Sequence, residues 1–251
     1  MIIVKNEEEL AKMRASAELA ARVRDAVAEK TCPGITTLEL SKFAGKMIRD
    51  LGGASAFLGY RGYPGEICIS INESVVHGIP DGRRIAVGDI VGIDVGVNYE
   101  GFVGDTATTV MVGVTDPEVI KLVRTTEKAL AGAIKSARAG ARLSDVSHTI
   151  EKTARESGFS VVRDFVGHGI GRSMHEDPQI PNFGKPGHGP VLKEGMTMCF
   201  EPMINMGKSG VEVLEDGWTV VTKDRSLSAH FEHTVAVRAG ESEILSVGRN
   251  Y

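Results

Sequence analysis

Residues 91–110, VGIDVGVNYEGFVGDTATTV, are the stretch that decides the fold. Valine, isoleucine and threonine recur on both sides of a short polar centre, which is typical of two strands joined by a tight turn. An aspartate lies in each half, Asp94 and Asp105. Carboxylates are poor strand residues and are costly to bury without a partner. The stretch therefore predicts a hairpin whose two acids need an explanation.

The spacing of these two aspartates favours one shared face of the hairpin. If the turn is centred between Tyr99 and Glu100, Asp94 and Asp105 lie directly opposite each other, with Cβ atoms about 4.5–5.5 Å apart. Two like charges at that distance destabilise a sheet unless water, a proton or a cation lies between them. The hairpin alone leaves three interpretations open: a pair on a solvated face, a dyad that shares a proton, and a metal site.

The segments around the hairpin indicate helices and further strands. Asn6, followed by three glutamates, and the capping box Thr36-x-x-Glu39 each predict the start of a helix. Helical patterns return near 116–138 and 144–157, the stretch 66–76 alternates like a strand, and strands with glycine-rich loops follow from 161. This order predicts an α+β fold in one domain over residues 1–251, with a mainly antiparallel sheet and helices packed on one face.

The composition argues against several classes of protein. The 251 residues are 42% hydrophobic and 25% charged, with a net charge of −4 and no long run of lysine or arginine, so nucleic acid is not expected as the main partner. The N-terminus turns acidic after four residues, and no apolar run approaches the roughly 18 residues of a membrane span. Cys32, Cys68 and Cys199 are odd in number and widely spaced, which disfavours disulfides and a thiolate zinc site. We expect a cytoplasmic enzyme.

The second half adds one histidine and two more acids in apolar surroundings. His168 lies among three glycines in FVGHGIGRSMHEDP (165–178), which indicates backbone that turns or comes close to another segment. Glu201 interrupts GMTMCFEPMI (195–204), and Glu232 interrupts SAHFEHTVAV (228–237). If the four carboxylates converge, two divalent cations would balance their charge. Oxygen ligands with one imidazole suit Mn, Fe or Co, and paired ions of this kind are a known device for hydrolysis.

Several motifs resemble those of the bacterial-type (type I) methionine aminopeptidases, and the resemblance covers essentially the whole chain. The matching stretches are GYRGYPGEICISINESVVHGIP (59–80), IDVG with GFVGDTATT, GHGIGRSMHEDPQIPNFG (167–184), FEPM (200–203) and DGWTVVTKDRSLSAHFEHTVAV (216–237). The resemblance implies the pita-bread fold, in which two pseudo-symmetric halves of a curved antiparallel sheet carry helices on the outer face. It also implies removal of the initiator methionine from peptides whose second residue is small.

The resemblance further assigns roles to residues by their position. Asp105 and Glu232 would bridge two divalent metal ions (Mn, Fe, Co, Ni or Zn), and Glu201 would also act as a general base. His77 and His175 would contact the substrate and stabilise the transition state. The full set of implied metal ligands is Asp94, Asp105, His168, Glu201 and Glu232. The implied substrate pocket is lined by Tyr60, Tyr63, Cys68, His77, Phe165, His175 and Trp218, with Met174 near its mouth.

Three positions depart from the usual pattern of these enzymes. Val166 replaces a cysteine, Met174 a phenylalanine and His230 a glutamine; we expect them to alter the pocket rim without touching a ligand. The resemblance also implies nascent methionyl peptides near the ribosome as substrates, and a monomer. Two alternatives stay open. One is a proline-specific aminopeptidase or prolidase of the same fold, and the other is a peptide-binding scaffold that has lost catalysis.

Overall fold

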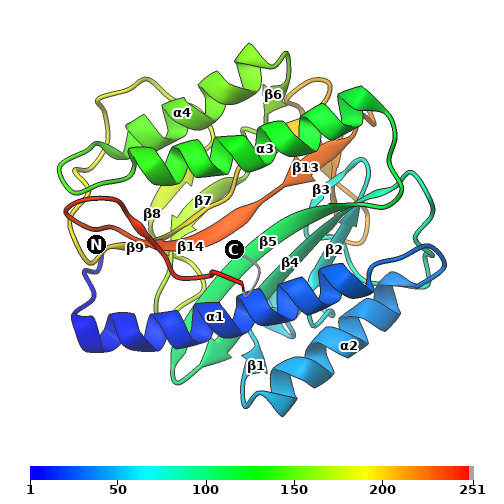
Figure 1. Ribbon diagram of the computed structural model, residues 1–251, viewed down its shortest axis with the longest axis horizontal. Helices are drawn as coiled ribbons and strands as arrows, with labels where there is room; N and C mark the ends of the chain where they lie inside the picture. Colours follow the sequence, from blue (N-terminus) through cyan, green and yellow to red (C-terminus); the bar gives the residue numbers. More distant parts are fainter. Residues whose placement is uncertain (249–251) are drawn as a thin grey trace.

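The computed structural model describes residues 1–248, and its elements follow the predicted order of helices, strands, helices, strands (Figure 1). The first half comprises α1 (Glu7–Lys30), α2 (Thr37–Asp50), β1 (Ala54–Ser55), the short 3₁₀ turn Tyr60–Gly62, β2 (Cys68–Ile71), β3 (Ser74–Val76), β4 (Ile90–Tyr99) and β5 (Phe102–Met111). The second comprises α3 (Pro117–Ser136), α4 (Leu143–Glu156), β6 (Ser160–Val161), β7 (Val166–Gly169), β8 (Glu176–Pro181), β9 (Thr197–Phe200), β10 (Met203–Asn205), β11 (Val211–Val213), β12 (Val220–Thr222), β13 (Ser228–His230), β14 (Glu232–Ala236) and β15 (Glu243–Ile244).

The first two helices begin at the predicted capping residues. The side chain of Asn6 accepts a hydrogen bond from the backbone N–H of Glu9 at 2.9 Å, and the Glu9 carboxylate accepts from the N–H of Asn6 at 3.2 Å. Thr36 and Glu39 form the same reciprocal pair at the start of α2. The predicted strand 66–76 is instead two strands, β2 and β3, because Asn72 takes a positive φ of 58° and turns the chain between them.

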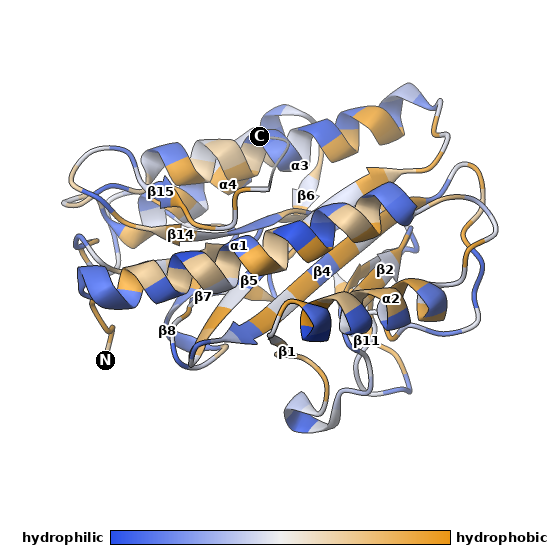
Figure 2. Ribbon diagram, turned by 60° about the horizontal axis from the view of Figure 1, so that its bottom comes forward, coloured by the Kyte–Doolittle hydropathy of each residue, from blue (hydrophilic) through white to orange (hydrophobic). Residues whose placement is uncertain are grey.

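One nine-stranded sheet runs through both halves of the molecule. Its order is β1-β4-β5-β14-β9-β7-β8, with β2 added to β4 and β15 to β14, and all these pairs are antiparallel. In Figure 1 the four helices lie on one face, with α1 and α2 over β4 and β5, and α3 and α4 over the second half. Figure 2 shows hydrophobic and hydrophilic residues along each helix, as expected of helices that bury one side. The predicted antiparallel sheet with helices on one face is confirmed.

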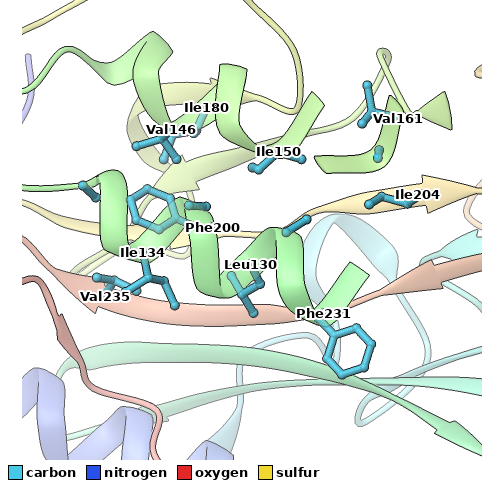
Figure 3. Packing of buried hydrophobic residues seen from close by; sticks show 14 of the residues in the cluster. Leu130, Ile134, Val146, Ile150, Val161, Ile180, Phe200, Ile204, Phe231 and Val235 are labelled. Atoms are coloured by element: carbon cyan, nitrogen blue, oxygen red, sulfur yellow. The ribbon is translucent and has the colours of Figure 1, made fainter. Parts of the chain in front are cut away.

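Each helix pair encloses its own hydrophobic cluster. In the first half, Ile93 and Val95 of β4 pack with residues of α1 and α2. In the second half, Leu130 and Ile134 of α3 pack with Val235 of β14, and Figure 3 shows these side chains meeting above the sheet. Because alternate strand residues point to opposite faces, these clusters leave the intervening side chains on the face without helices.

The β4–β5 hairpin differs from the prediction in its register. Tyr99 pairs with Phe102, so the turn consists of Glu100 and Gly101, whose φ values of 52° and 78° suit a two-residue turn. Asp94 therefore lies opposite Ala107, and Asp105 lies opposite Gly96. The prediction that the two aspartates are directly opposed is wrong, because the chain turns one residue later than expected. They are diagonal neighbours on the same face, since a shift of two residues preserves the side-chain alternation.

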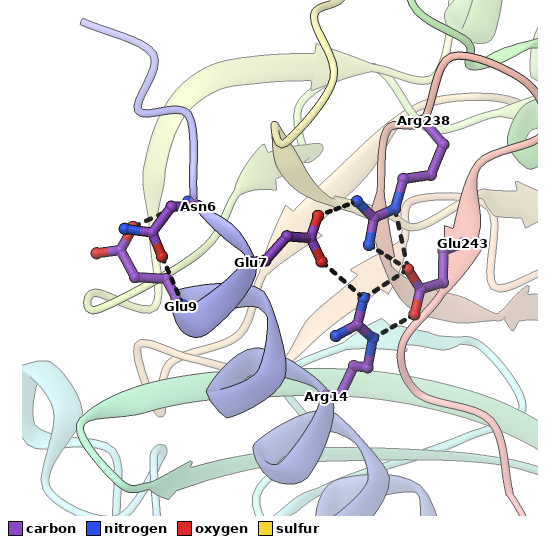
Figure 4. Close-up of polar contacts among 6 residues, drawn as sticks. All are labelled: Asn6, Glu7, Glu9, Arg14, Arg238 and Glu243. Carbon is purple, nitrogen blue, oxygen red and sulfur yellow. Dashed lines mark hydrogen bonds and ion pairs between the residues drawn. The ribbon is translucent and has the colours of Figure 1, made fainter.

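A polar network ties the start of α1 to the C-terminal strand (Figure 4). The carboxylate of Glu243 accepts hydrogen bonds from Arg14 and from Arg238, whose Nη2 lies 2.7 Å from Glu243 Oε2. Arg238 also donates to Glu7 Oε1 at 2.6 Å. The hydrogen bond from Arg14, followed by that from Arg238, lowers the pKa of Glu243 to about 2 even though partial burial opposes this.

A Glu243→Gln substitution is expected to destabilise the protein near neutral pH and to have no effect near pH 2. Because the folded pKa is depressed, the ionised carboxylate contributes stability above the unfolded pKa of about 4.3, and that contribution is lost as pH falls through about 2. The expected difference near pH 7 is about 1 kcal/mol, since the network is partly exposed. Urea unfolding of both proteins across this pH range measures it; a difference that does not depend on pH would contradict the ionic origin.

Candidate active site

The acids that interrupted the apolar strands lie in two neighbouring rows across the sheet. In one row Asp94 of β4 pairs with Ala107 of β5, which pairs with Glu232 of β14. His233 pairs with Phe200, so the next residue after β9, Glu201, continues this row beside Glu232. The row thus carries three carboxylates from three strands that are distant in sequence.

The second row carries the remaining acid and the histidine. Thr234 of β14 pairs with Cys199 of β9, and Cys199 pairs with His168 of β7. Asp105 lies on the other side of Thr234, because its N–H donates to the Thr234 hydroxyl at 3.0 Å and its carbonyl accepts from that hydroxyl at 2.7 Å. The rows are two residues apart along each strand, so their side chains share the face away from the helices.

Contacts to His168 bring the two rows together. Its Nε2 lies 3.5 Å from Glu201 Oε1 and 4.0 Å from Asp105 Oδ2. Its Nδ1 lies 2.9 Å from the carbonyl oxygen of Gly169, which can only accept, so Nδ1 carries the hydrogen and Nε2 presents its lone pair to the acids. This is the usual arrangement of a metal-binding imidazole.

The glycines around His168 are required by close backbone contacts. A Cβ on Gly167 would lie 2.4 Å from the carbonyl oxygen of Cys199, and one on Gly169 would lie 2.0 Å from that of Asp177. Only glycine lets β7 approach β8 and β9 this closely. The prediction of a close backbone approach is confirmed, although the segment forms a strand.

The electrostatics of the site favour bound cations. Within residues 1–248, buried Asp94 Oδ1, Asp105 Oδ1 and Glu232 Oε1 have no hydrogen-bond partner. Burial, reinforced by the charge of Asp105, raises the pKa of Glu201 and of Glu232 well above the ordinary value. Burial also raises the pKa of Asp94 well above its usual range and that of Asp105 to about 7. Divalent ions would replace these protons and take the unpartnered oxygens as ligands, so the residues present fit a metal centre.

Metal-free protein is expected to lose stability as pH rises above about 6.5. The folded pKa values of Asp94, Glu201 and Glu232 are raised, so the protons they retain stabilise the fold until pH rises through those values. Below about pH 6.5 the stability should instead rise with pH, because burial lowers the pKa values of His168 and His230. Thermal unfolding of chelator-treated protein at about pH 6.5 and 8.5 measures the effect.

Two controls separate the carboxylates from other titrating groups. A Glu232→Gln variant should show a shallower loss above about pH 6.5, because glutamine does not ionise. Added Mn²⁺ should raise the midpoint most at the higher pH, since the cation binds deprotonated carboxylates. At 100 times its dissociation constant the ion would add about 2.7 kcal/mol. Equal slopes with and without Mn²⁺ would argue against the carboxylates as its ligands.

A cavity of about 240 Å³ opens over the acids, and all the predicted site residues contribute to its lining. These are Tyr60, Tyr63, Cys68, His77, Asp94, Asp105, Phe165, His168, His175, Glu201, Trp218 and Glu232. Val166 and Met174 also line it. Phe57, Arg61 and Val76 also line the cavity and were not predicted. Arg61 lies in the Gly/Tyr-rich loop 59–63 and Phe57 lies just before it, so this loop was the available signal for both.

Two further histidines, His77 and His175, line the cavity. The His77 ring makes edge contacts with Phe165 and Trp218, with centroids 5.6 and 6.1 Å apart. Burial, with a smaller contribution from His175, lowers the pKa of His77 to about 4, so its ring is neutral near pH 7. His175 Nδ1 lies 2.8 Å from the Tyr60 hydroxyl, and its ring lies 4.3 Å from that of His168.

His230, one of the three departures from the usual pattern, lies closer to a predicted metal ligand than expected. His230 is buried, and its Nε2 lies 3.9 Å from Glu201 Oε2. The expectation that none of the three departures touches a predicted ligand is therefore wrong for His230, because β13 leads directly into β14 and brings this side chain next to Glu201. Val166 and Met174 line the cavity, consistent with a rim position.

Comparison with known proteins places the chain in a family. The family model described as metallopeptidase family M24 matches residues 11–239. This chain belongs to metallopeptidase family M24. It is 48% identical over 247 residues to methionine aminopeptidase from Clostridium perfringens, covering 98% of this chain and 99% of that protein. It also matches a crystal structure of methionine aminopeptidase from Thermotoga maritima with a TM-score of 0.96 and 46% identity, over 98% and 99% of the two chains.

More distant solved structures show the fold alone. A prolidase from Pyrococcus horikoshii matches with a TM-score of 0.80 at 22% identity, and this chain covers 65% of it. The α+β pita-bread fold expected from the sequence is thus confirmed, and membership of M24 implies that the site uses divalent metal. Among the helices of residues 1–248, none has the length and hydropathy needed to cross a membrane.

Proposed function

We propose that this M24 metallopeptidase removes the N-terminal, initiator methionine from peptides whose second residue is small. The observation that carries the proposal is full-length similarity, 48% identity over 98% of the chain, to a protein named methionine aminopeptidase. The cavity supports it, because apolar and aromatic side chains line it together with the buried acids. One catalytic domain over residues 1–251 and a cytoplasmic location are part of the same proposal.

The metal centre in this proposal is built from the five residues of the two rows. Asp105 and Glu232 would each contribute to both of two divalent ions, and Asp94, His168 and Glu201 would complete the set. The unpartnered oxygens of Asp94, Asp105 and Glu232 support this assignment. When bound, the ions supply Lewis-acid activation of water and of the scissile carbonyl. Mn, Fe, Co, Ni and Zn all remain candidates for the ions.

The chain's own groups would handle the protons and the developing charge. Glu201 would accept the proton of the attacking water, a role that requires the ionised carboxylate that bound cations would favour. His175 is held by the Tyr60 hydroxyl at 2.8 Å and would donate a hydrogen bond to the scissile peptide. His77, neutral near pH 7, would stabilise the transition state from its place beside Phe165 and Trp218.

The proposed methionine pocket is apolar and preformed. Tyr63 packs edge-on against Trp218, with centroids 5.1 Å apart, and its hydroxyl donates to the Gly78 carbonyl at 2.8 Å. That hydroxyl is therefore directed to the backbone, and the ring edges remain for the substrate. A thioether is polarisable and packs favourably on aromatic edges. A second residue larger than alanine, serine or threonine would have to fit beside the acids, which is our reason to expect a small one.

A peptide assay with defined metals tests the proposal. Chelator-treated protein supplied with Mn²⁺, Fe²⁺, Co²⁺ or Ni²⁺ should hydrolyse Met-Ala-Ser and leave a Gly-Pro dipeptide intact. Preference for the Gly-Pro dipeptide would favour the prolidase alternative. No turnover with any of the metals would favour the peptide-binding scaffold. We propose nascent chains as the natural substrate and a monomer as the working form; size-exclusion chromatography with light scattering tests the latter.

A further inference from the structure

The loop that carries His175 belongs to neither of the strands that it joins. Residues 171–175 form a series of bends between β7 and β8, and His175 is the last of them, directly before Glu176. The His175 ring reaches the Tyr60 hydroxyl at 2.8 Å. Because a bend lacks the regular hydrogen bonds of a strand ladder, the position of this imidazole depends on other contacts that hold the loop.

A buried ion pair holds the end of this loop. Lys5 Nζ lies 2.7 Å from Glu176 Oε2, and only 4% and 9% of the two side chains are exposed. The other carboxylate oxygen, Oε1, accepts a hydrogen bond from the Ser173 N–H at 3.3 Å. The carboxylate of Glu176 thus connects the N-terminal segment to the backbone two residues before His175.

The ion pair also packs directly against the backbone of the loop. A Cβ on Gly171 would lie 2.5 Å from Glu176 Oε1 and 2.7 Å from Lys5 Cε. Glycine at this position lets the start of the loop approach the two charged groups. The pair therefore contacts the loop at both ends, at Gly171 and at Glu176.

Lys5 is fixed to the strand that helps to form the candidate metal centre. Its N–H donates to the Gly195 carbonyl at 2.8 Å, and Val4 forms a β-bridge with Met196, directly before β9. Strand β9 pairs with His168 of β7. The ion pair therefore ties the His175 loop to the same strand framework that positions the metal ligands.

Two other ion pairs near this loop involve exposed groups. Arg172 pairs with Glu9 at 3.4 Å, and 64% of the Arg172 side chain is exposed. The Met1 ammonium pairs with Asp177 at 2.6 Å, and both groups are exposed. Exposed pairs contribute little, whereas removal of one member of a buried pair leaves an uncompensated charge. The buried pair is therefore expected to hold the loop most strongly.

We propose that Lys5 is a positioning residue for catalysis, which acts through Glu176 to hold His175 in place for the scissile peptide. The inference rests on the proposed function and on the role of His175 in it. Lys5 and Glu176 lie outside the lining of the cavity, so neither contacts the substrate or the metal directly. Loss of the ammonium should therefore act on the rate through a misplaced imidazole, and a displacement of about 1 Å can cost about 10²-fold.

A double-mutant cycle on the full chain supplied with Mn²⁺ tests the inference. Lys5→Met removes the ammonium and keeps an unbranched side chain. It should lower kcat for Met-Ala-Ser by about 10–10²-fold and change KM by less than about threefold. In a His175→Ala background the same substitution should change kcat by less than about twofold, because the group that Lys5 positions is absent. A loss of folded protein would instead lower kcat by the same factor in both backgrounds.

Two further variants support the cycle. Glu176→Gln keeps the shape of the side chain and removes its charge, so it should show the same dependence on His175, and it carries the cycle if Lys5→Met does not fold. Lys12 pairs with Glu8 on the exposed side of α1 at 3.0 Å, and Lys12→Met should leave kcat and KM unchanged. Metal analysis of each variant should show the metal content of the unchanged chain.

Hydrogen exchange gives a readout that does not depend on turnover. The backbone amides of residues 171–177 should exchange faster in Lys5→Met and in Glu176→Gln than in the unchanged chain, because the loop would open more often. The corresponding amides in Lys12→Met should exchange at the original rate.

The outcomes separate this inference from the proposed function. If Lys5→Met lowered kcat equally with and without His175, or did not lower it, the positioning role would be overturned and the proposed function would stand. Unchanged exchange of residues 171–177 in Lys5→Met would also overturn it, because other contacts would then hold the loop. No turnover of Met-Ala-Ser by the unchanged chain would overturn the proposed function and, with it, the role assigned to Lys5.

Discussion

An Asp105→Ala variant is expected to lose both metal ions and at least about 10³-fold in turnover of Met-Ala-Ser. In the proposed centre this carboxylate is a ligand to both ions, so its loss would leave both coordination shells incomplete. Lewis-acid stabilisation by a bound metal is worth several kcal/mol, and each 1.36 kcal/mol corresponds to a factor of ten in rate. Metal analysis of the purified variant, together with the peptide assay, measures both effects.

A matched control uses an acid outside the site. Asp50 lies at the exposed end of α2, where it pairs with Lys46, and Asp50→Ala should keep full metal content and activity. Glu232→Ala should reproduce the loss seen with Asp105→Ala, because Glu232 has the same bridging role in the proposal. If either site variant retained two equivalents of metal, the assignment of these residues as ligands would be contradicted.

Turnover by a His77→Ala variant is expected to fall by about 10²–10³-fold, the effect of removing one transition-state hydrogen-bond donor. Metal content should not change, because the His77 ring lies against Phe165 and Trp218 on the cavity wall. If His77 acts mainly in the transition state, kcat should fall far more than KM rises. Steady-state kinetics and metal analysis on the same preparation separate these effects.

His188, a histidine outside the cavity, provides the control for the His77→Ala experiment. His188 is exposed, and the contact it makes to Ser144 uses its backbone, so His188→Ala should leave kinetics and metal content unchanged. The φ of His77 is +59°, in the region that favours glycine, so alanine removes the ring without relieving the backbone. Loss of metal in His77→Ala would instead make this residue a ligand.

Much of the architecture could be predicted from local signals. The capping boxes at Asn6 and Thr36 and the apolar periodicity located all four helices to within a few residues, because these signals depend only on near neighbours in sequence. The residues expected to line the site were also found together, since acids in apolar strands are conspicuous whichever strands they occupy.

What could not be predicted depends on pairing between distant strands. The predicted hairpin register was wrong by one residue, because the choice between Tyr99-Glu100 and Glu100-Gly101 as the central pair of the turn depends on the φ of Glu100. The position of Cys199 beside His168 follows from the pairing of β9 with β7, and the approach of His230 to Glu201 follows from the path of β13. Nothing in a single strand's sequence reveals its neighbours.

The position of β14 between β5 and β9 has a consequence for how the protein folds. Asp105 and Glu232 meet through pairing of segments more than a hundred residues apart, and closing so long a loop is entropically slow. We therefore expect the cation site to assemble late in folding, after the transition state. Metal should slow unfolding while leaving the refolding rate unchanged, which stopped-flow kinetics with and without Mn²⁺ would detect. Metal binding would thus complete folding by joining residues from the two halves of the sheet.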